Sequence, residues 1–315
     1  MKIAFLFPGQ GAQYIGMGKD IYNKYEEARN IFEKVSKITD IDIAKLCFTG
    51  KVKQDNDINR TQYTQIAIAT TSLAILEMLK KENINPEVLT GLSLGEYTAL
   101  IYGKYLELED GIKLLKQRGY LMQNFVPKEE FSMVAIIGLD SKIIENICNE
   151  IQKSGEFIQI ANYNYSQQTV ISGNVEAIEK ASELLKQKGA KKIIKLNTSG
   201  PFHTKKLQQA SDLYRKALDN IDMKIGDILV IKNLDGTIYS QGNDIKDILQ
   251  KHIINPVRFD KTINKMLDMK IDTFIEIGPG KTLTGFIKKE NKDVKTYNIY
   301  DVETLENTIK EIRGV

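Results

Sequence analysis

The sequence predicts an α/β protein whose mostly parallel sheet is interrupted by a small α+β unit. Apolar runs typical of strands alternate with helical patterns in both outer parts of the chain, from a strand at 2–7 to one at 272–277. Helices placed between apolar strands favour a parallel sheet, because parallel strands need crossover connections. Between residues 132 and 197 the expected order is strand, helix, strand, strand, helix, strand, the split pattern of ferredoxin-like domains.

In the first outer part, the opening strand runs into a glycine-rich turn at 8–11. Residues 64–80 are apolar on almost every face, which predicts a helix buried in the middle of the molecule. An extended segment at 87–92 precedes a helical pattern that begins at Glu96, so Ser93 is expected where a strand turns sharply into a helix. In the last part we expect, besides the strand already given, a strand at 225–233 and a helix at 244–252.

The inner unit divides the chain into two domains. Its elements are expected at 133–139, 141–153, 157–162, 168–172, 175–188 and 191–196, with Ser141 as the N-cap of the first helix. Residues 129–197 are therefore interpreted as an inserted ferredoxin-like subdomain. Residues 1–128 and 198–315 would form one discontinuous α/β catalytic domain.

Composition excludes several classes of protein. The net charge of +3, from 44 basic and 41 acidic residues, argues against a nucleic-acid binder that relies on bulk charge. The two cysteines, Cys47 and Cys148, predict neither a disulfide scaffold nor a zinc site. The apolar start at 3–7 is too short for a signal peptide, and no run approaches the ~20 apolar residues of a membrane-spanning helix. We therefore expect a soluble cytoplasmic protein.

The segment Gly91-Leu92-Ser93-Leu94-Gly95 has the spacing of a nucleophile elbow. Small neighbours let the backbone fold tightly, so that the serine hydroxyl points outward from a strand-to-helix turn. The N–H of the residue after the serine then lies at a helix N-terminus and can face an oxyanion. By itself the pattern fits an ordinary glycine-flanked turn equally well, because Gly-x-Ser-x-Gly also occurs by chance.

The chain contains two histidines, His203 and His252. A serine nucleophile needs a base that works near neutral pH, and histidine is the usual one. His203 lies in the turn-rich loop 199–204 after the last strand of the inner unit, a common location for active-site groups. His252 lies near the end of a helical stretch. A structural role is the default for either, but one of them is expected to be the base if Ser93 is a nucleophile.

Several further segments follow one another over nearly the whole chain: FPGQGAQ at 7–13, GLSLGEY at 91–97, QRG at 117–119, ANYN at 161–164, ISG at 171–173, SGPFH at 199–203, NPVRF at 255–259 and EIGPGKTLTG at 276–285. In this order they resemble one family, the malonyl-coenzyme A:acyl carrier protein transacylases of fatty acid synthesis. No single segment is decisive, but the ordered set is highly specific. The resemblance implies an α/β-hydrolase-like core with an inserted ferredoxin-like subdomain, in agreement with the predicted elements.

The resemblance also implies catalytic roles. Ser93 would carry the malonyl group as an ester, with His203 as its base and later as the acid for the leaving thiol. The N–H groups of Gln10 and Leu94 would form the oxyanion hole. Arg118 would pair with the free malonyl carboxylate, which suits the planar fork of arginine. Without the resemblance, Arg118 would be interpreted as an ordinary solvated helix residue.

Four more residues are implied to lie at the substrate: Leu92, Asn162, Phe202 and His252. Leu92 stands where histidine is usual in the family, which removes a polar group beside the acyl pocket. His252 stands where glutamine or asparagine is usual, and the family attributes the contact that orients the catalytic histidine to the main-chain carbonyl at this position. A carbonyl survives any side-chain change. Phe202 is bulky and should crowd a branched α-carbon, which favours malonyl over methylmalonyl.

The implied chemistry is a two-step exchange between malonyl-CoA and acyl carrier protein. Coenzyme A leaves after the serine is acylated, and the phosphopantetheine thiol of the carrier then collects the acyl group. No metal or organic cofactor is required, and the FPGQG segment lacks the lysine and the spacing of phosphate-binding loops. An acidic carrier protein calls for a local basic surface. We expect a monomer with no nucleic-acid or membrane partner.

Other functions stay open at this point. A trans-acting acyltransferase of a polyketide synthase, or the malonyl transferase of a malonate decarboxylase, would share the same residues and chemistry. A serine esterase on a related fold is disfavoured by Arg118, by the FPGQG segment and by the lack of an obvious triad aspartate after Ser93. A non-catalytic binding module is disfavoured because Ser93, His203 and Arg118 are all present.

Overall fold

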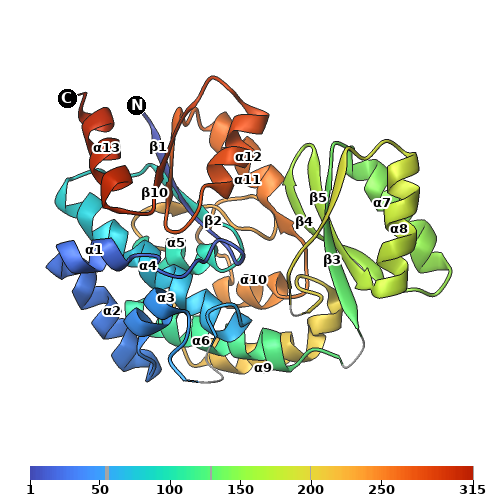
Figure 1. Ribbon diagram of the computed structural model, residues 1–315, viewed down its shortest axis with the longest axis horizontal. Coiled ribbons are helices and arrows are strands. Elements are labelled where there is room, and N and C mark those ends of the chain that lie inside the picture. The colour runs from blue at the N-terminus through green and yellow to red at the C-terminus, as the bar shows by residue number, and fades with distance from the viewer. Residues whose placement is uncertain (54–56, 128–129, 199, 315) are drawn as a thin grey trace.

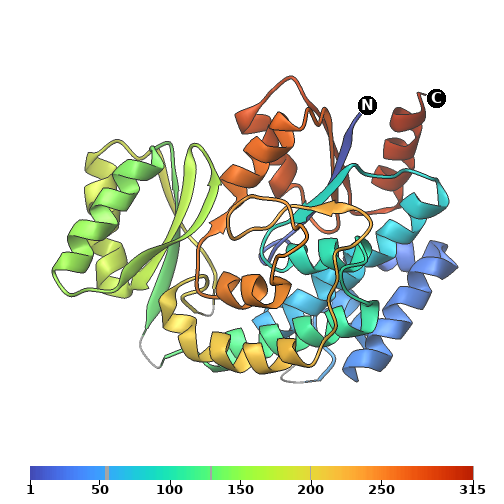
Figure 2. The same ribbon diagram turned by 180° about the vertical axis from the view of Figure 1, so that it is seen from behind.

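The computed structural model describes residues 1–53, 57–127, 130–198 and 200–314, which form two lobes built around two sheets (Figures 1 and 2). Ser199 of the SGPFH segment, the predicted domain boundary at 128–129, and Val315 lie outside the described residues. No helix in the described part of the chain has the length and apolar character needed to cross a bilayer.

The first sheet is parallel throughout, with the strand order β10-β9-β1-β2-β7. Its strands are β1 (Ile3–Phe7), β2 (Val88–Gly91), β7 (Leu229–Val230), β9 (Thr273–Ile277) and β10 (Lys295–Ile299). Every residue of the central strand β1 is buried, because helices cover both faces of a parallel sheet. The prediction of a mostly parallel α/β core is confirmed. The strand expected at 225–233 is much shorter than predicted, and β10 was not predicted.

Helices surround this sheet. They are α1 (Lys19–Lys24), α2 (Glu26–Thr39), α3 (Ile43–Thr49), α4 (Thr61–Lys81), α5 (Gly95–Tyr102), α6 (Leu108–Asn124), α9 (Gln208–Asp219), α10 (Ile245–His252), α11 (Phe259–Asp268), α12 (Thr282–Glu290) and α13 (Val302–Arg313), with a 3-10 turn at Lys205–Leu207. Helix α4 is buried along most of its length and packs against α2, α5 and α6. The central helix predicted at 64–80 is therefore confirmed.

The second sheet has the strand order β6-β3-β5-β4-β8. It contains β3 (Phe131–Ile137), β4 (Ile158–Tyr165), β5 (Gln168–Asn174) and β6 (Lys192–Lys195), and α7 (Ser141–Lys153) and α8 (Val175–Gln187) cover its outer face (Figure 1). The predicted order of strands and helices is confirmed, while the domain boundaries stay a prediction. The predicted N-cap of α7 is wrong: Asp140 is the cap, because its carboxylate accepts the N–H of Lys142.

A short strand from the outer part of the chain extends the second sheet. Strand β8 (Val257–Arg258) pairs in parallel with β4, where Asn162 is opposite Val257. Two residues are too few to give a periodic signal, so the sequence did not indicate this strand. The pairing fixes the edge of the second sheet to the chain that follows α10.

The two faces of the second sheet have different roles. Val134 and Ile136 of β3 pack in the cluster formed with α7 and α8. The alternate residues Met133 and Ala135 point the other way, toward the first lobe, because successive side chains of a strand face opposite sides. Because this second face is turned toward the first lobe, it forms one wall of a cavity.

Candidate active site

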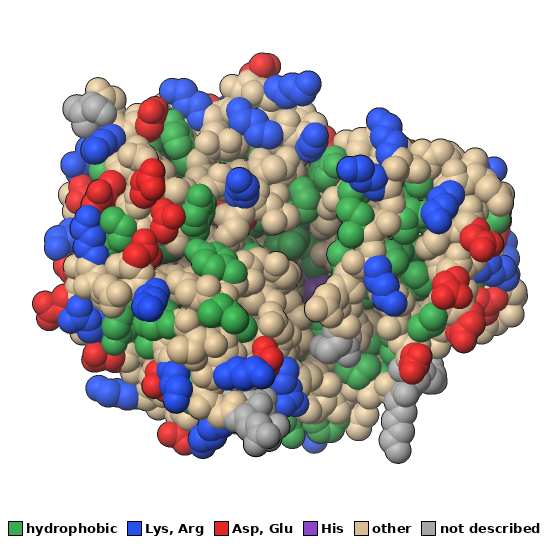
Figure 3. Space-filling view, viewed as in Figure 1, with side chains coloured by type: hydrophobic (Ala, Val, Ile, Leu, Met, Phe, Trp, Pro, Cys, Tyr) green, Lys and Arg blue, Asp and Glu red, His purple; other side chains and the backbone are tan. Residues whose placement is uncertain are grey.

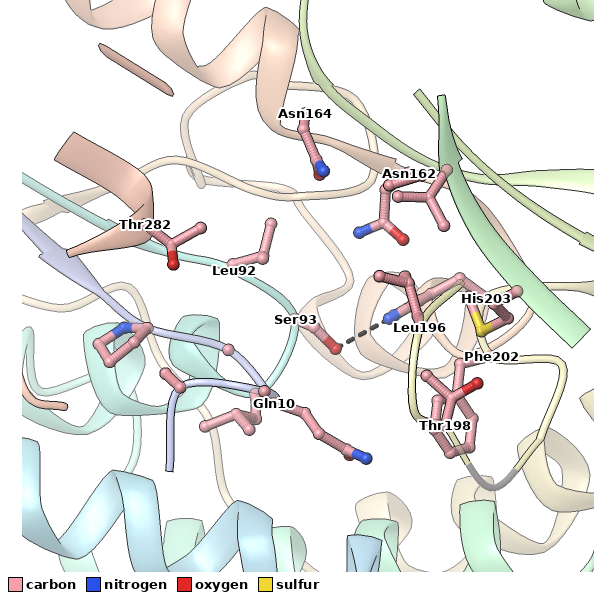
Figure 4. Close-up of a pocket in the computed structure, with 18 of the residues that line it drawn as sticks. Gln10, Leu92, Ser93, Asn162, Asn164, Leu196, Thr198, Phe202, His203 and Thr282 are labelled. Atoms are coloured by element: carbon pink, nitrogen blue, oxygen red, sulfur yellow. Dashed lines mark hydrogen bonds between the residues drawn. The ribbon is translucent and has the colours of Figure 1, made fainter. Parts of the chain in front are cut away.

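A cavity of about 350 Å³ lies between the first lobe and the inner face of the second sheet. Figure 3 shows the hollow between the lobes, with a histidine side chain visible in its floor. Its lining contains eight of the residues singled out in the sequence: Gln10, Leu92, Ser93, Leu94, Arg118, Asn162, Phe202 and His203. Residues from distant parts of the chain are thus brought to one site (Figure 4).

Ser93 occupies a tight turn between β2 and α5, as the sequence predicts. Its φ of 55° lies in the left-handed region, which is uncommon for a residue with a side chain. A Cβ on Gly95 would lie 2.1 Å from the carbonyl oxygen of Phe7, and one on Gly91 would lie 2.2 Å from the carbonyl carbon of Gly95. Only glycine fits at these two positions, so the motif spacing is explained by backbone packing.

The side chain of Asn233 holds this turn from behind. Its Oδ1 accepts the N–H of Ser93 at 2.7 Å, and its Nδ2 donates to the carbonyl of Gly91 at 2.7 Å. Asn233 is fully buried just beyond β7. Both ends of one amide are therefore used to fix the backbone on either side of Leu92, which stabilises the left-handed conformation of Ser93.

His203 makes the contacts expected of a base for Ser93. Its Nε2 lies 2.8 Å from the Ser93 hydroxyl, and its Nδ1 lies 2.9 Å from the main-chain carbonyl of His252 (Figure 4). Because a carbonyl can only accept, Nδ1 carries the proton and Nε2 is free to accept from the hydroxyl. Burial, and then the charge of Arg118, lower the pKa of His203 to about 3. The ring is therefore neutral at physiological pH.

Arg118 of α6 is buried beside the hydroxyl of Ser93. Its Nη2 donates to the Ser93 Oγ at 2.9 Å, and its Nη1 donates to the Gln65 side-chain oxygen at 2.7 Å. The guanidinium also lies over the ring of Tyr97, with 5.3 Å between Cζ and the ring centroid. Only 1% of Arg118 is exposed, so this is a charge held in the site and not the solvated helix residue that the local sequence alone suggests.

Two residues beside Ser93 have main-chain N–H groups that are candidates for an oxyanion site. Gln10 follows β1 and Leu94 directly precedes α5, and both line the cavity. Among the described residues, neither N–H donates a hydrogen bond within the protein, while the Gln10 side chain donates to Thr61. The tight approach of the two loops requires Gly9, where a Cβ would lie 2.8 Å from the carbonyl oxygen of Leu92.

The residues expected at the substrate do not all lie at the cavity. Leu92, Asn162 and Phe202 line it. The His252 side chain is only 1% exposed and lies behind His203, with 4.9 Å between the ring centroids. The expectation that this side chain contacts substrate is therefore wrong, because the His203 ring stands in the way. Its main-chain carbonyl has the orienting contact that the resemblance implies.

A large part of the cavity wall opposite Ser93 is apolar. It is formed by the inner face of the second sheet, with Met133, Ala135, Val170, Ile194 and Leu196. In β3, β5 and β6 these positions are aligned by pairing, since Ala135 is opposite both Val170 and Ile194. Asn162 and Asn164 of β4 and Gln168 of β5 add amide groups to the lining from the same sheet, so an acyl chain or a thioester arm would meet both hydrocarbon and amide groups there.

Sequence reasoning missed three residues of the site. Asn233 and Gln65 have no motif that marks them, although Gln65 is a polar residue in an otherwise apolar helix, which is a usable signal. Glu96 belongs to the GLSLGEY segment, but its burial could not be predicted from a helical pattern. Within the described ranges, no cluster of three or more histidine, cysteine, aspartate or glutamate residues could hold a metal ion.

Comparison with known proteins agrees with this geometry. The family model described as acyl transferase domain matches residues 4–311. The malonyl CoA-acyl carrier protein transacylase of Bacillus subtilis (strain 168) is 39% identical over 312 residues, which cover 99% of this chain and 98% of that protein.

Solved structures of similar proteins give the same result. The malonyl CoA-acyl carrier protein transacylase from Clostridium perfringens superposes with a TM-score of 0.95 at 40% identity, covering 100% of this chain and 98% of that one. A malonyl-transacylase in complex with a type II PKS acyl-carrier protein superposes with a TM-score of 0.93 at 30% identity, covering 99% of this chain and 100% of that one. An acyl transferase match over nearly the whole chain, together with relatives of this identity and coverage, shows that the protein is an acyltransferase and belongs to the malonyl CoA-acyl carrier protein transacylase family.

Proposed function

We propose that this protein transfers the malonyl group from malonyl-CoA to the phosphopantetheine thiol of acyl carrier protein, supplying fatty acid synthesis. The observation that carries the proposal is the arrangement around one hydroxyl: Ser93 Oγ lies 2.8 Å from His203 Nε2 and 2.9 Å from Arg118 Nη2. A base and a fixed positive charge at one serine suit an acyl donor that is itself an anion. In this proposal the protein is a cytoplasmic monomer that needs no cofactor.

In the first step, His203 Nε2 takes the proton of the Ser93 hydroxyl while Oγ attacks the thioester carbonyl carbon. The negative charge that develops on the carbonyl oxygen would be stabilised by the N–H groups of Gln10 and Leu94. The tetrahedral intermediate collapses with breakage of the carbon–sulfur bond. His203 returns its proton to the sulfur, so coenzyme A leaves as a thiol and malonyl remains as an ester on Ser93.

The second step repeats the first in reverse with a different thiol. The carrier's phosphopantetheine thiol gives its proton to His203 and attacks the ester carbonyl, and Ser93 leaves with the proton restored to its oxygen. The His252 carbonyl keeps the His203 ring in the required tautomer during both steps.

Arg118 would select the acyl group by its free carboxylate. One arm of its guanidinium is bound to Gln65 and the other to Ser93. A malonyl carboxylate would take over the second arm, which leaves the Ser93 oxygen free to attack. The contact with Gln65 would keep the guanidinium in place during this exchange.

Intact mass spectrometry after mixing with malonyl-CoA tests the proposal directly. The wild-type protein should gain one malonyl group, and Ser93→Ala should gain none, because the ester has no oxygen to form on. Adding holo acyl carrier protein should then remove the adduct from the enzyme and place it on the carrier. An adduct that survives in Ser93→Ala, or one lost only to water, would contradict this function.

The position of Phe202 leads to a second expectation, which concerns the preference between malonyl and methylmalonyl groups. It is buried next to His203 and lines the cavity, so an α-methyl group on the acyl chain would press against its ring. Malonyl transfer should therefore exceed methylmalonyl transfer by about 10- to 100-fold, the usual effect of one methyl group in a closed pocket. The ratio of kcat/KM for the two thioesters measures this, and faster methylmalonyl transfer would refute it.

Supply of a polyketide synthase is the second candidate, because one similar structure is a malonyl-transacylase bound to a type II PKS acyl-carrier protein. The chemistry on Ser93 would be the same. Comparing kcat/KM for holo carrier proteins of the two pathways distinguishes the candidates.

A further inference from the structure

A buried carboxylate and a buried imidazole face each other directly behind the site. Glu96 lies in the first turn of α5, and His252 is the last residue of α10. Their exposed fractions are 0% and 1%, and Glu96 Oε2 lies 3.2 Å from His252 Nδ1. This separation is short enough for a hydrogen bond, but the angles are not those of a formed one. Among the described residues, neither atom has another hydrogen-bond partner.

We propose that Glu96 and His252 share one proton and, as a pair, position His203 against Ser93. The inference rests on the proposed roles of Ser93 and His203. Neither Glu96 nor His252 would touch the substrate. Both would act through the groups that they hold, so we regard them as positioning residues.

The hydrogen bonds of Glu96 indicate where the shared proton lies. Its Oε1 accepts the Tyr239 hydroxyl at 2.7 Å and, more weakly, the Asn233 N–H at 3.4 Å. Oε1 is therefore the acceptor oxygen, and Oε2 is left to face His252. Burial raises the pKa of Glu96 to about 7 and lowers that of His252 well below its usual value, so both groups favour their neutral forms. When the ring proton of the neutral His252 is on Nε2, one proton is left for Oε2 and Nδ1 together.

The pair is connected to both His203 and Ser93. On one side, the His252 carbonyl accepts the Nδ1 proton of His203, and the two rings lie 4.9 Å apart at 30°. On the other side, Glu96 holds the main chain of Asn233, whose side chain fixes the turn at Ser93. A change in the contact between Glu96 and His252 would therefore shift the distance between hydroxyl and base.

Other ionisable groups face the pair and must be taken into account in its pH dependence. They are Arg118 on α6, His203 in the loop after β6, Tyr97 on α5, and Lys232, Asp235 and Tyr239 between β7 and α10. Tyr97 and Tyr239 have a raised pKa because of burial, so they stay neutral in the range that matters. Arg118 is a constant positive charge. Glu96 is thus the group expected to titrate near neutrality.

Nuclear magnetic resonance of protein with ¹⁵N-labelled histidine tests the shared proton without any assay of activity. The chain has two histidines, so His252→Gln assigns both imidazoles by difference. In the wild type, the His252 nitrogen shifts should change near pH 7 as Glu96 loses its proton. In Glu96→Gln, which keeps hydrogen-bonding atoms but cannot ionise, they should stay constant over that range. Identical titrations in the two proteins would overturn the proposal.

Kinetics test the positioning role. Glu96→Ala and His252→Ala should each lower kcat by about 10- to 100-fold, with a small change in KM for malonyl-CoA, because the misplaced base affects the reaction and not the binding. Glu96→Gln and His252→Gln should recover most of that loss. The double alanine variant should be little worse than either single one, as for residues that act as a unit.

Equal kcat values for Glu96→Ala and Glu96→Gln, or additive losses in the double variant, would refute the positioning role. A failure of the proposed function looks different: the wild type would then form no malonyl ester, while the histidine spectra would still report on the pair.

Discussion

Replacing His203 with alanine is expected to lower malonyl transfer by about 10²- to 10⁴-fold, the usual contribution of a general base and acid. The imidazole is 2.8 Å from the Ser93 hydroxyl, and the other side chain bound to that oxygen, the Arg118 guanidinium, cannot accept a proton. The loss should appear in kcat/KM measured with malonyl-CoA and holo carrier protein.

His252→Gln is the matched control for this experiment, because it alters the second histidine but keeps the carbonyl that orients His203. Most of the transfer activity should survive. The glutamine amide can also still meet Glu96. Thermal unfolding of both variants would verify that each is folded. Equal and near-total losses in the two variants would show that the base has been assigned to the wrong residue.

Replacing Arg118 with alanine should reverse the preference of the enzyme between acyl groups. Removing one partner of a buried guanidinium–carboxylate pair costs about 2–5 kcal/mol, so malonyl transfer should fall by roughly 30- to 5,000-fold. Acetyl transfer, which involves no carboxylate, should change far less. The measurement is kcat/KM for malonyl-CoA and acetyl-CoA with the wild type and the variant.

The contact between Arg118 and the Ser93 oxygen provides the competing explanation. If Arg118 served mainly to lower the pKa of the nucleophile, both acyl groups would lose activity by the same factor. Such a parallel loss would contradict carboxylate selection. Arg118→Lys is a useful companion, since it keeps the charge but loses the planar guanidinium, which holds Gln65 with one arm while the other is available to the carboxylate.

The turn at Ser93 could be predicted because both glycines that it requires lie within five consecutive residues. A Cβ at Gly91 or at Gly95 would collide with backbone atoms, so both positions have to be glycine, and their spacing around Ser93 is visible in the sequence. The scarcity of histidines restricted the base to two candidates in the same way. The choice between them needed the structure, which places His203 at the hydroxyl and His252 behind it.

Contacts between distant segments could not be predicted from local patterns. Asn233 meets Ser93 across a separation of 140 positions, and no periodicity connects them. Strand β8 is defined by its pairing with β4, and not by its own two residues. Arg118 lies on a helix that is partly exposed, so only the surrounding packing reveals that its charge is buried.

The residues on the inner face of the second sheet are distinct from the reactive groups, so substrate fit and bond breaking involve different sets of residues. In the proposed mechanism, bond breaking would depend on the first lobe and on the loop that carries His203, whereas the fit of the acyl chain would depend partly on alternate residues of β3, β5 and β6. Their neighbours on the other face pack against α7 and α8 and maintain the sheet. Ile194 is 46% exposed, so a substitution there could change the acyl preference with little loss of packing, whereas Met133 and Ala135 are buried in the core and changes there would also lower stability.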